Sequence, residues 1–465
     1  MTLKKPDGLF PLPLTAFEKY ILSDESEDYP MTFFLQIRLR GTLIREFIED
    51  AVDEALNRHP LLCCRIELIG TIPHWIWAPE LRQPIEWNSD QWKQKRPWSQ
   101  PRDLRTNIGI EGWAELQDDV TEITLQFHHA CCDGIGASQF LEDIAAIYSR
   151  HFAHEYPEQS APQLRALNSQ LLRERNSEAG RRIANLSGSV FRRFGVITKY
   201  TLKYLQQRIV PLAAHCSESG SDASDLDTGL VSQVLSRTTT RSLRNVAKHH
   251  SATLNDVLVR DLMLVAAEWN ADVGPPRSRD SICVLTPNSL RGPSDDAMPA
   301  ANVVGYVFLT RNISRMKHSG DLLCSLRDEM QLVHKYQAGW FFLQAIRALQ
   351  QYGPILRLYL RQSKKRCMST AVLSHLGNAL NSITSRLPSR DGKVLVGNVE
   401  LESIRCIPPI RPHTHVVLAT MLMNGQLILN VRMNPHHFSI EQTHRFMTAF
   451  VKRLERTASE TEGSL

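Results

Sequence analysis

The feature that most constrains the fold of this chain is a strand, a tight turn and a helix that follow one another in the first third of the sequence. Apolar and polar side chains alternate through residues 121–129, so His129 shares one face of a predicted strand with Leu125 and Phe127. The letters CCDGIG then predict a turn, and residues 137–150 repeat apolar side chains at helical spacing. The pattern predicts a pair of histidines at the end of a strand, directly before a helix.

Strands and helices alternate along the rest of the chain, which indicates an α/β or α+β class with two lobes of similar size. A chain of 465 residues with 42% hydrophobic residues can bury more than one core. The Asn424-Gly425 pair between two apolar runs predicts a β-hairpin. The other predicted strands are 31–41, 61–70, 281–291, 302–312 and 393–405, and the other predicted helices are 45–58, 243–250, 251–270, 318–366 with an interruption at Gly353-Pro354, and 439–455.

We predict a boundary between the lobes in a basic and then Ser/Asp/Gly-rich region. Residues 1–175 form the N-terminal lobe that carries the histidine pair, and residues 233–465 form the C-terminal lobe. Between them, residues 176–232 contain a basic helical connector and a loop, 215–229, whose composition predicts disorder. The basic segment is interpreted as a solvated connecting helix, with a membrane-surface helix as the alternative.

Composition limits the setting in which the protein works. The nine cysteines form no CxxC pair and are odd in number, which favours a reducing compartment over a disulfide framework. We see neither a secretion signal nor a stretch of 18 apolar residues, so we expect a cytoplasmic protein, with peripheral membrane contact as an alternative. The net charge of +5 favours an anionic substrate or membrane surface and does not call for nucleic acid.

The pair His128-His129, followed by Asp133 and Gly134, is the candidate for chemistry. Histidine has an ordinary pKa of about 6.5, which suits a general base near neutral pH. Alternation turns His129 into the protected interior and His128 the other way, so we predict that His129 is the base and that His128 packs or forms hydrogen bonds. Asp133 can hold the turn through a buried ion pair, and Gly134 suits a sharp turn or a close approach.

Two other interpretations of the pair stay open. Adjacent histidines at a strand end can be purely structural. A metal site that adds Cys131, Cys132 and Asp133 has suitable ligand types, but neighbouring strand residues diverge and zinc spacings are absent, so we expect no metal. The pairs His249-His250 and His436-His437 are not followed by Asp-Gly and are set aside.

Several segments, in the same order along the chain, resemble the superfamily of chloramphenicol acetyltransferase, nonribosomal peptide condensation domains, wax ester synthases and alcohol acyltransferases. Residues 128–134 are similar to its HHxxxDG motif. Residue His375 stands where this superfamily usually has asparagine, and the plant-type DFGWG segment is absent. The other similar segments are PLTAFEKYIL (13–22), ALNRHPLL (55–62), SATLNDVLV (251–259), PNSLR (287–291), ANVVG (301–305) and VLSHLG (372–377).

The resemblance implies two chloramphenicol-acetyltransferase-like lobes with a tunnel between them. His129 is then the catalytic base midway along the tunnel, and Asp133 pairs with Arg291 to fix the loop. Gly134 leaves room for the reacting groups. The residues that the resemblance places along the tunnel wall are Ser374, Gly377 and Asn302.

The activity implied by the resemblance is transfer of an acyl group, other than an aminoacyl group, from a thioester to a hydroxyl or amine by direct attack. We favour acyl-coenzyme A as the donor substrate and expect no bound cofactor. One alternative is a condensation-type amide or ester synthase whose donor is carried on the phosphopantetheine of a carrier protein acting in trans. The other is a non-catalytic binding module of the same fold.

Overall fold

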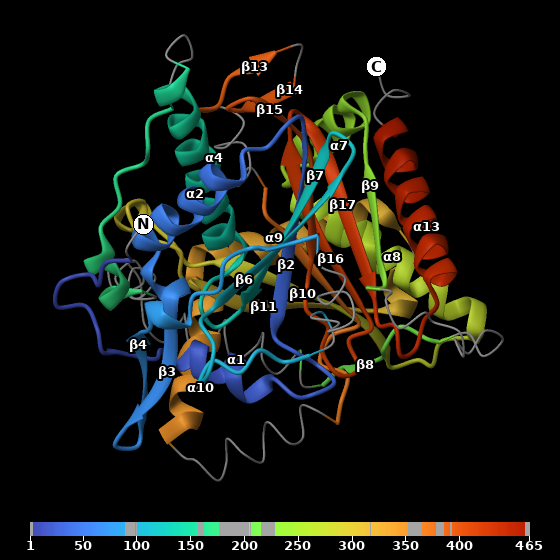
Figure 1. Cartoon of the computed structure of the whole chain (residues 1–465). Helices are drawn as coiled ribbons and strands as arrows, with labels where there is room; N and C mark the ends of the chain where they lie inside the picture. Colours follow the sequence, from blue (N-terminus) through green and yellow to red (C-terminus); the bar gives the residue numbers. More distant parts are fainter. Residues whose placement is uncertain are drawn as a thin grey trace.

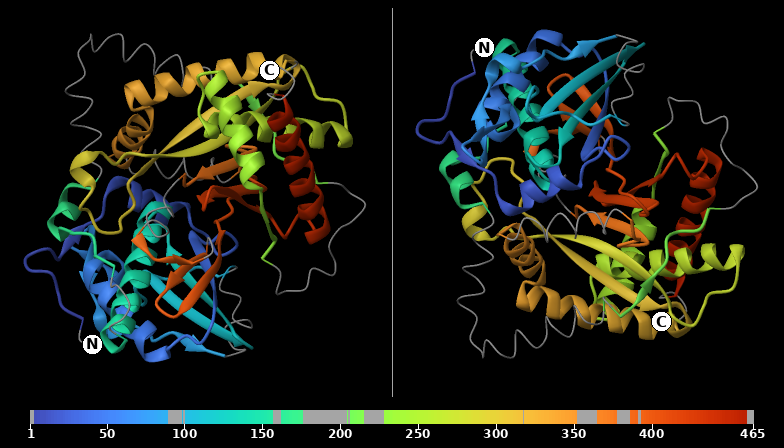
Figure 2. Two further views of the ribbon diagram at one scale, coloured as in Figure 1. Left: turned by 90° about the horizontal axis from the view of Figure 1, so that it is seen from above. Right: turned by 90° about the horizontal axis from the view of Figure 1, so that it is seen from below.

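A computed structural model describes residues 3–88, 98, 100–156, 162–175, 204, 206–214, 228–316, 318–351, 365–377, 386–390 and 393–460. Two lobes lie side by side, each built around a seven-stranded sheet (Figures 1 and 2). The predicted α/β class with two lobes is confirmed.

The N-terminal lobe packs two helices against one face of its sheet. Helices α2 and α4 contact each other, and their apolar faces share one core with β2 and β7. A smaller sheet with the order β1-β4-β3 extends this lobe. The elements of the first half are β1 (Leu12–Pro13), α1 (Ala16–Asp24), β2 (Thr32–Arg40), α2 (Arg45–Arg58), β3 (Cys64–Ile69), β4 (Ile72–Trp77), β5 (Glu86–Trp87), β6 (Ile110–Gln117), β7 (Val120–His128) and α4 (Gly134–Glu155).

The C-terminal lobe packs α7, α8, α9 and α13 against its sheet, in which the strand order is β11-β10-β12-β16-β17-β9 and β8 pairs with β10. Helix α10 contacts both β11 of this sheet and α1 of the N-terminal lobe. The elements are β8 (Arg208–Ile209), β9 (Leu230–Val234), α7 (Arg237–His249), α8 (Leu254–Val273), β10 (Asp280–Ser289), β11 (Val304–Asn312), α9 (Ser319–Tyr336), α10 (Ala338–Gln351), β12 (Ala371–His375), β13 (Ser389–Arg390), β14 (Lys393–Val396), β15 (Val399–Ile407), β16 (Val416–Met423), β17 (Gln426–Met433) and α13 (Ile440–Ser459).

Strands β13, β14 and β15 cross from the second half of the chain into the sheet of the N-terminal lobe. Strand β15 pairs antiparallel with β2, with Ile404 opposite Ile37. These strands fall within 233–465, the range predicted for the C-terminal lobe, so that prediction does not describe where they pack. The chain returns to its own lobe after β15, and Arg411 in this return segment forms an ion pair with Asp24 of α1.

Several predicted elements have different bounds in the structure. The helix predicted for 318–366 is broken at Gln337, whose φ of 53° is left-handed, and Gly353-Pro354 lies outside the described residues. The strand predicted for 393–405 is two strands, β14 and β15, which turn at Gly397. Helix α4 begins at Gly134 and not at 137.

The predicted hairpin is confirmed, because β16 and β17 pair antiparallel around Asn424 and Gly425, whose φ values of 52° and 76° fit a two-residue turn. Most of the predicted connector and loop, 176–203 and 215–227, lies outside the described residues. Among the described helices, we find none with the length and apolar character needed to cross a membrane.

Candidate active site

The turn after β7 is fixed by backbone hydrogen bonds on both sides. The amide of His128 donates to the carbonyl of Gly109 at 2.9 Å, and the amide of His129 donates to the carbonyl of Met31 at 2.8 Å. His128 pairs with Thr32 of β2 at the last position of the antiparallel ladder. These contacts fix the backbone of both histidines at the end of β7.

His129 lines a cavity of about 140 Å³ between the two lobes. Its ring lies 5.1 Å from that of Phe33, centroid to centroid. Other wall residues come from both lobes, among them Met31, Leu285, Tyr306, Val372, Ser374, Arg411 and Ala419. The cavity is thus where a small molecule can meet the imidazole away from bulk water.

The local geometry selects which ring nitrogen of His129 faces a reactant. The ring forms a hydrogen bond with its own backbone carbonyl. Asn302 Nδ2 donates to this carbonyl at 2.6 Å and lies 3.2 Å from Nδ1 of the ring. Asn302 therefore occupies the Nδ1 side of the ring, which leaves Nε2 as the ring nitrogen available to a reactant.

Burial lowers the pKa of His129, which keeps the imidazole neutral near neutral pH. The hydrogen bond to its own carbonyl and the negative charge of Asp133 act in the opposite direction and raise the pKa. The ring of His129 is therefore neutral and lies near a carboxylate able to stabilise its protonated form.

Asp133 holds the turn in place through four contacts. Its Oδ1 accepts from the amide of Gly136 at 2.8 Å, which caps the N-terminus of α4. Its Oδ2 accepts from the amide of Val303 at 2.8 Å and from Arg291 Nη1 at 2.7 Å. Arg291 also donates to the carbonyl of Ala301 at 2.8 Å, and the amide of Asp133 donates to the same carbonyl at 3.3 Å. The structure therefore contains the Asp133–Arg291 ion pair, which joins the turn to the C-terminal lobe.

His128 is fully buried and points away from the cavity. Its Nδ1 accepts from the amide of Ala130 at 3.1 Å, and its Nε2 lies 3.3 Å from Glu25 Oε2. Glu25 in turn accepts from the amide of Met31, whose carbonyl binds the His129 amide. His128 therefore supports the turn and does not line the cavity.

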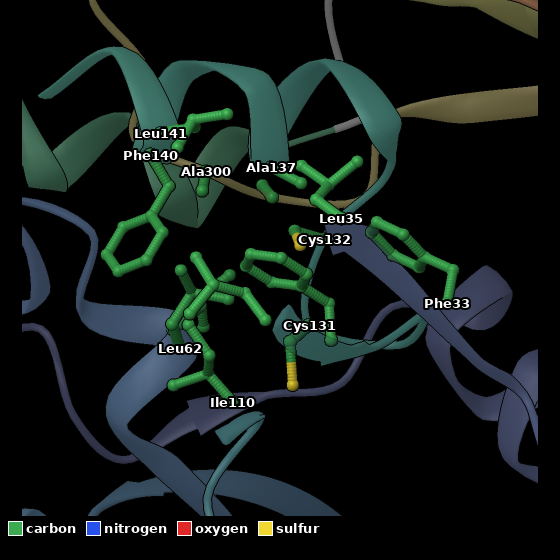
Figure 3. Packing of buried hydrophobic residues seen from close by; sticks show 14 of the residues in the cluster. Phe33, Leu35, Leu62, Ile110, Cys131, Cys132, Ala137, Phe140, Leu141 and Ala300 are labelled. Carbon is green, nitrogen blue, oxygen red and sulfur yellow. The ribbon is translucent and has the colours of Figure 1, made fainter. Parts of the chain in front are cut away.

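The two cysteines of the turn belong to the core. Cys131 and Cys132 are fully buried, and Figure 3 shows them among Leu62, Ile110 and Ala137 beneath α4. Burial raises the pKa of both thiols well above its usual range, so neither is a reactive thiolate. In the described part of the chain, no group of three or more His, Cys, Asp or Glu side chains has the arrangement of a metal site.

The remaining predicted site residues fall in different places. Gly134 and Ser374 line the cavity together with His129. Asn302 does not line it but donates a hydrogen bond to the backbone carbonyl of His129. Gly377 lines a neighbouring cavity. A Cβ at Gly134 would lie 2.6 Å from Leu376 Cδ2. The lack of a side chain at Gly134 therefore leaves room for Leu376 of the C-terminal lobe.

His59 is a supporting residue whose role the sequence did not predict, although it was part of the ALNRHPLL match. Its Nε2 lies 2.9 Å from Asp143 Oδ2, and its Nδ1 accepts from the amide of Ala300 at 2.8 Å. Burial lowers the pKa of His59, in keeping with a neutral ring that accepts at Nδ1. His59 thereby holds the segment that carries Asn302. The one sequence feature that could have predicted this role is the position of His59 in the Arg-His-Pro motif.

No protein-family model matches this chain, and no curated protein matches it. Among solved structures, the first condensation domain of the calcium-dependent antibiotic synthetase aligns with a TM-score of 0.66 at 14% identity, over 96% of each chain. Polyketide synthase associated protein 5 from Mycobacterium tuberculosis aligns with a TM-score of 0.56 at 16% identity, over 97% of this chain and 98% of that chain. The starter condensation domain of rhizomide synthetase RzmA, in complex with C8-CoA, aligns with a TM-score of 0.64 at 12% identity, over 96% of this chain and 95% of that chain.

The chain has the condensation-domain fold. The resemblance that the sequence motifs carried is confirmed at the level of the fold. The alignments span nearly the whole of each chain, so both lobes of the condensation-domain fold are present here.

The first prediction concerns the ion pair at the turn. Arg291→Gln is expected to lower the free energy of unfolding by about 3 kcal/mol, because it leaves the nearly buried Asp133 carboxylate without its cation. Urea denaturation followed by tryptophan fluorescence measures the loss. The matched control is Arg65→Gln, which breaks the solvent-exposed pair with Glu67 and is expected to cost less than about 1 kcal/mol. Equal losses in the two variants would contradict the structural role of the Asp133–Arg291 pair.

Proposed function

We propose that this chain is an acyltransferase that moves an acyl group from a thioester to a hydroxyl or amine, with His129 as general base. The observation that carries the proposal is the neutral imidazole of His129, which lines a cavity between the lobes while its Nδ1 side is occupied by its own carbonyl and by Asn302. A base in this setting can accept a proton from a bound nucleophile without competition from bulk water.

In the proposed reaction, the acceptor oxygen or nitrogen attacks the thioester carbonyl carbon while His129 Nε2 takes the acceptor's proton. The carbonyl oxygen becomes an oxyanion in the tetrahedral intermediate. When the intermediate collapses, the carbon–sulfur bond breaks and the departing thiolate takes the proton from His129. The new ester or amide and the free thiol are the products, and no covalent acyl-enzyme forms.

Ser374 is the best-supported donor for the oxyanion. Its side chain belongs to the wall of the cavity that His129 also lines. The backbone amides just after His129 are less suited, because those of Ala130, Cys131 and Asp133 already donate to His128 Nδ1, to the His128 carbonyl and to the Ala301 carbonyl. A hydroxyl donor to an oxyanion contributes roughly 3 kcal/mol in comparable sites.

An acyl-coenzyme A is the donor that we favour. The starter condensation domain of rhizomide synthetase, which has the same fold, was solved in complex with C8-CoA, and this supports the choice. A donor on the phosphopantetheine of a carrier protein acting in trans is the second candidate, because other structures of this fold are condensation domains of synthetases.

Purified protein incubated with acyl-coenzyme A and mixed alcohol and amine acceptors tests the activity. Free-thiol release and mass spectrometry of the products measure it. Thiol release with matching ester or amide formation supports the proposal. Turnover with carrier-loaded acyl groups alone favours the condensation-type alternative, and binding without turnover of either donor favours a non-catalytic module.

The second prediction separates the two histidines. His129→Ala is expected to lower kcat by about 100- to 10,000-fold, because general-base catalysis contributes a factor of this size. His128→Ala is expected to lower mainly the free energy of unfolding, because His128 is buried and bonded to the turn. Steady-state thiol release and thermal denaturation measure the two effects. A His129→Ala enzyme with the wild-type rate would refute the assignment of the base.

The third prediction concerns pH. Because burial lowers the pKa of His129, the active neutral form persists below the ordinary histidine pKa and is lost as the pH falls through the lowered value. With an alcohol acceptor, kcat/KM is expected to fall on the acid side with an apparent pKa below about 6.5. A profile of kcat/KM against pH measures it. An acid limb centred above that value would contradict a buried neutral base.

A further inference from the structure

Two polar side chains of the active-site cavity have no role in the proposed reaction. Arg411 and Tyr306 line the same cavity as His129. Most of the other lining residues are apolar, among them Met31 and Leu285. A ligand cavity of this kind usually binds apolar groups and uses a few placed polar side chains to fix and select its ligand. The chemistry of Arg411 and Tyr306 therefore indicates which polar group the cavity accepts.

Asp24 and Tyr20 of α1 hold the guanidinium of Arg411 from one side. Nε and Nη2 of Arg411 donate to the two carboxylate oxygens of Asp24, and the distance from Nη2 to Oδ1 is 2.7 Å. Nη2 also donates to the hydroxyl of Tyr20 at 3.2 Å. The backbone is fixed as well, because the carbonyl of Arg411 accepts from the amide of Thr414 at 3.1 Å. Nη1 is thus the one guanidinium nitrogen that forms no hydrogen bond with any residue that the structure describes.

Tyr306 contributes a second hydrogen-bond donor to this cavity. It lies on β11 opposite Pro287 of β10, and its exposed fraction is 9%. Its ring centroid lies 6.4 Å from that of Tyr20, the residue that accepts from Arg411. Its hydroxyl forms no hydrogen bond within the described part of the chain, although a buried phenol usually has a partner. Tyr306 and Arg411 therefore leave two donors without acceptors at the wall of one cavity.

Both groups keep their protons at neutral pH. Burial raises the pKa of Tyr306, against the opposing effect of the Arg411 charge, so the phenol stays a donor. Burial acts to lower the pKa of Arg411, but Tyr20 and Asp24 raise it well above its usual range. The guanidinium charge is matched by the carboxylate of Asp24, whose side chain is 1% exposed. An ion pair without net charge favours a neutral ligand, because a carboxylate placed here would be buried without a cation of its own.

We propose that Nη1 of Arg411 and the hydroxyl of Tyr306 bind a neutral carbonyl oxygen of the substrate, distinct from the thioester carbonyl that reacts. The inference rests on the proposed function and adds a substrate class, an acyl group or an acceptor that carries a ketone or an amide. A carbonyl oxygen has two lone pairs and can accept from both donors at once. A hydrogen bond from a charged donor also contributes more to binding than one between neutral groups.

Binding of substrates supplied one at a time tests the inference without turnover. Isothermal titration calorimetry compares acetoacetyl-, isovaleryl- and malonyl-coenzyme A, whose acyl groups have similar shapes but end in a ketone, in methyl groups or in a carboxylate. Glycinamide, isobutylamine and glycine form the matching set of acceptor amines. In one of the two sets, the ketone or amide ligand is expected to have a Kd about tenfold lower than the other two ligands. The set that shows this preference identifies whether the acyl group or the acceptor carries the carbonyl.

Two variants remove the donors. Tyr306→Phe deletes only the hydroxyl, and Asp24→Asn/Arg411→Gln removes both charges of the ion pair, so that neither charge is left buried alone. Each variant is expected to raise the Kd of the preferred ligand about tenfold and to leave that of the apolar ligand unchanged. Tyr148→Phe is the matched control and is expected to change neither Kd, because the Tyr148 hydroxyl binds Asn398 outside this cavity. Thermal denaturation of all three variants identifies any loss caused by unfolding.

The outcomes separate this inference from the proposed function. Equal Kd values within both sets for the wild type, or tighter binding of the carboxylate ligands, would overturn the carbonyl site. Equal losses for every ligand in Tyr306→Phe and in the double variant would also overturn it, because a purely structural role affects all ligands alike. Preferred binding of a ketone or an amide without any turnover would leave the carbonyl site standing and reject the acyltransferase.

Discussion

The Asp133 carboxylate is the group on which the geometry of the site depends. One oxygen caps α4, and the other accepts from the backbone of Val303 and from Arg291 of the C-terminal lobe. A single side chain thereby fixes the start of a helix, the turn that carries His129 and the contact between the lobes. Because the carboxylate is nearly buried, each of these contacts stabilises it, and loss of one leaves a charge without compensation.

The charge of the same carboxylate opposes the effect of burial on the pKa of His129. Burial alone favours the neutral ring, which is the form a base needs before the reaction. The negative charge of Asp133 favours the protonated ring, which is the form that exists between proton uptake and proton return. The site thus combines an apolar enclosure with one nearby anion, and the proposed reaction uses both.

Local sequence patterns predicted the parts of the fold that neighbouring residues determine. Alternation through 121–129 predicted β7 and the orientation of His129, and the Asn-Gly pair predicted the β16–β17 hairpin. The break at Gln337 and the crossing of β15 into the N-terminal sheet had no local signal, because tertiary packing decides them. The contact of His59 with Ala300 joins residues 241 positions apart, and the approach of Leu376 to Gly134 also depends on how the lobes meet.

The most direct test of the account is the protonation state of His129, measured by heteronuclear NMR with isotopically labelled imidazole nitrogens and assigned by comparison with His129→Gln. At neutral pH, the account predicts an uncharged ring with the proton on Nδ1 and a free lone pair on Nε2, because burial favours the neutral ring and the proposed base needs Nε2 as the acceptor. This state is expected to persist as the pH falls below the ordinary histidine pKa. A ring that is positively charged at neutral pH, or that carries its proton on Nε2, would contradict the assignment of His129 as the base.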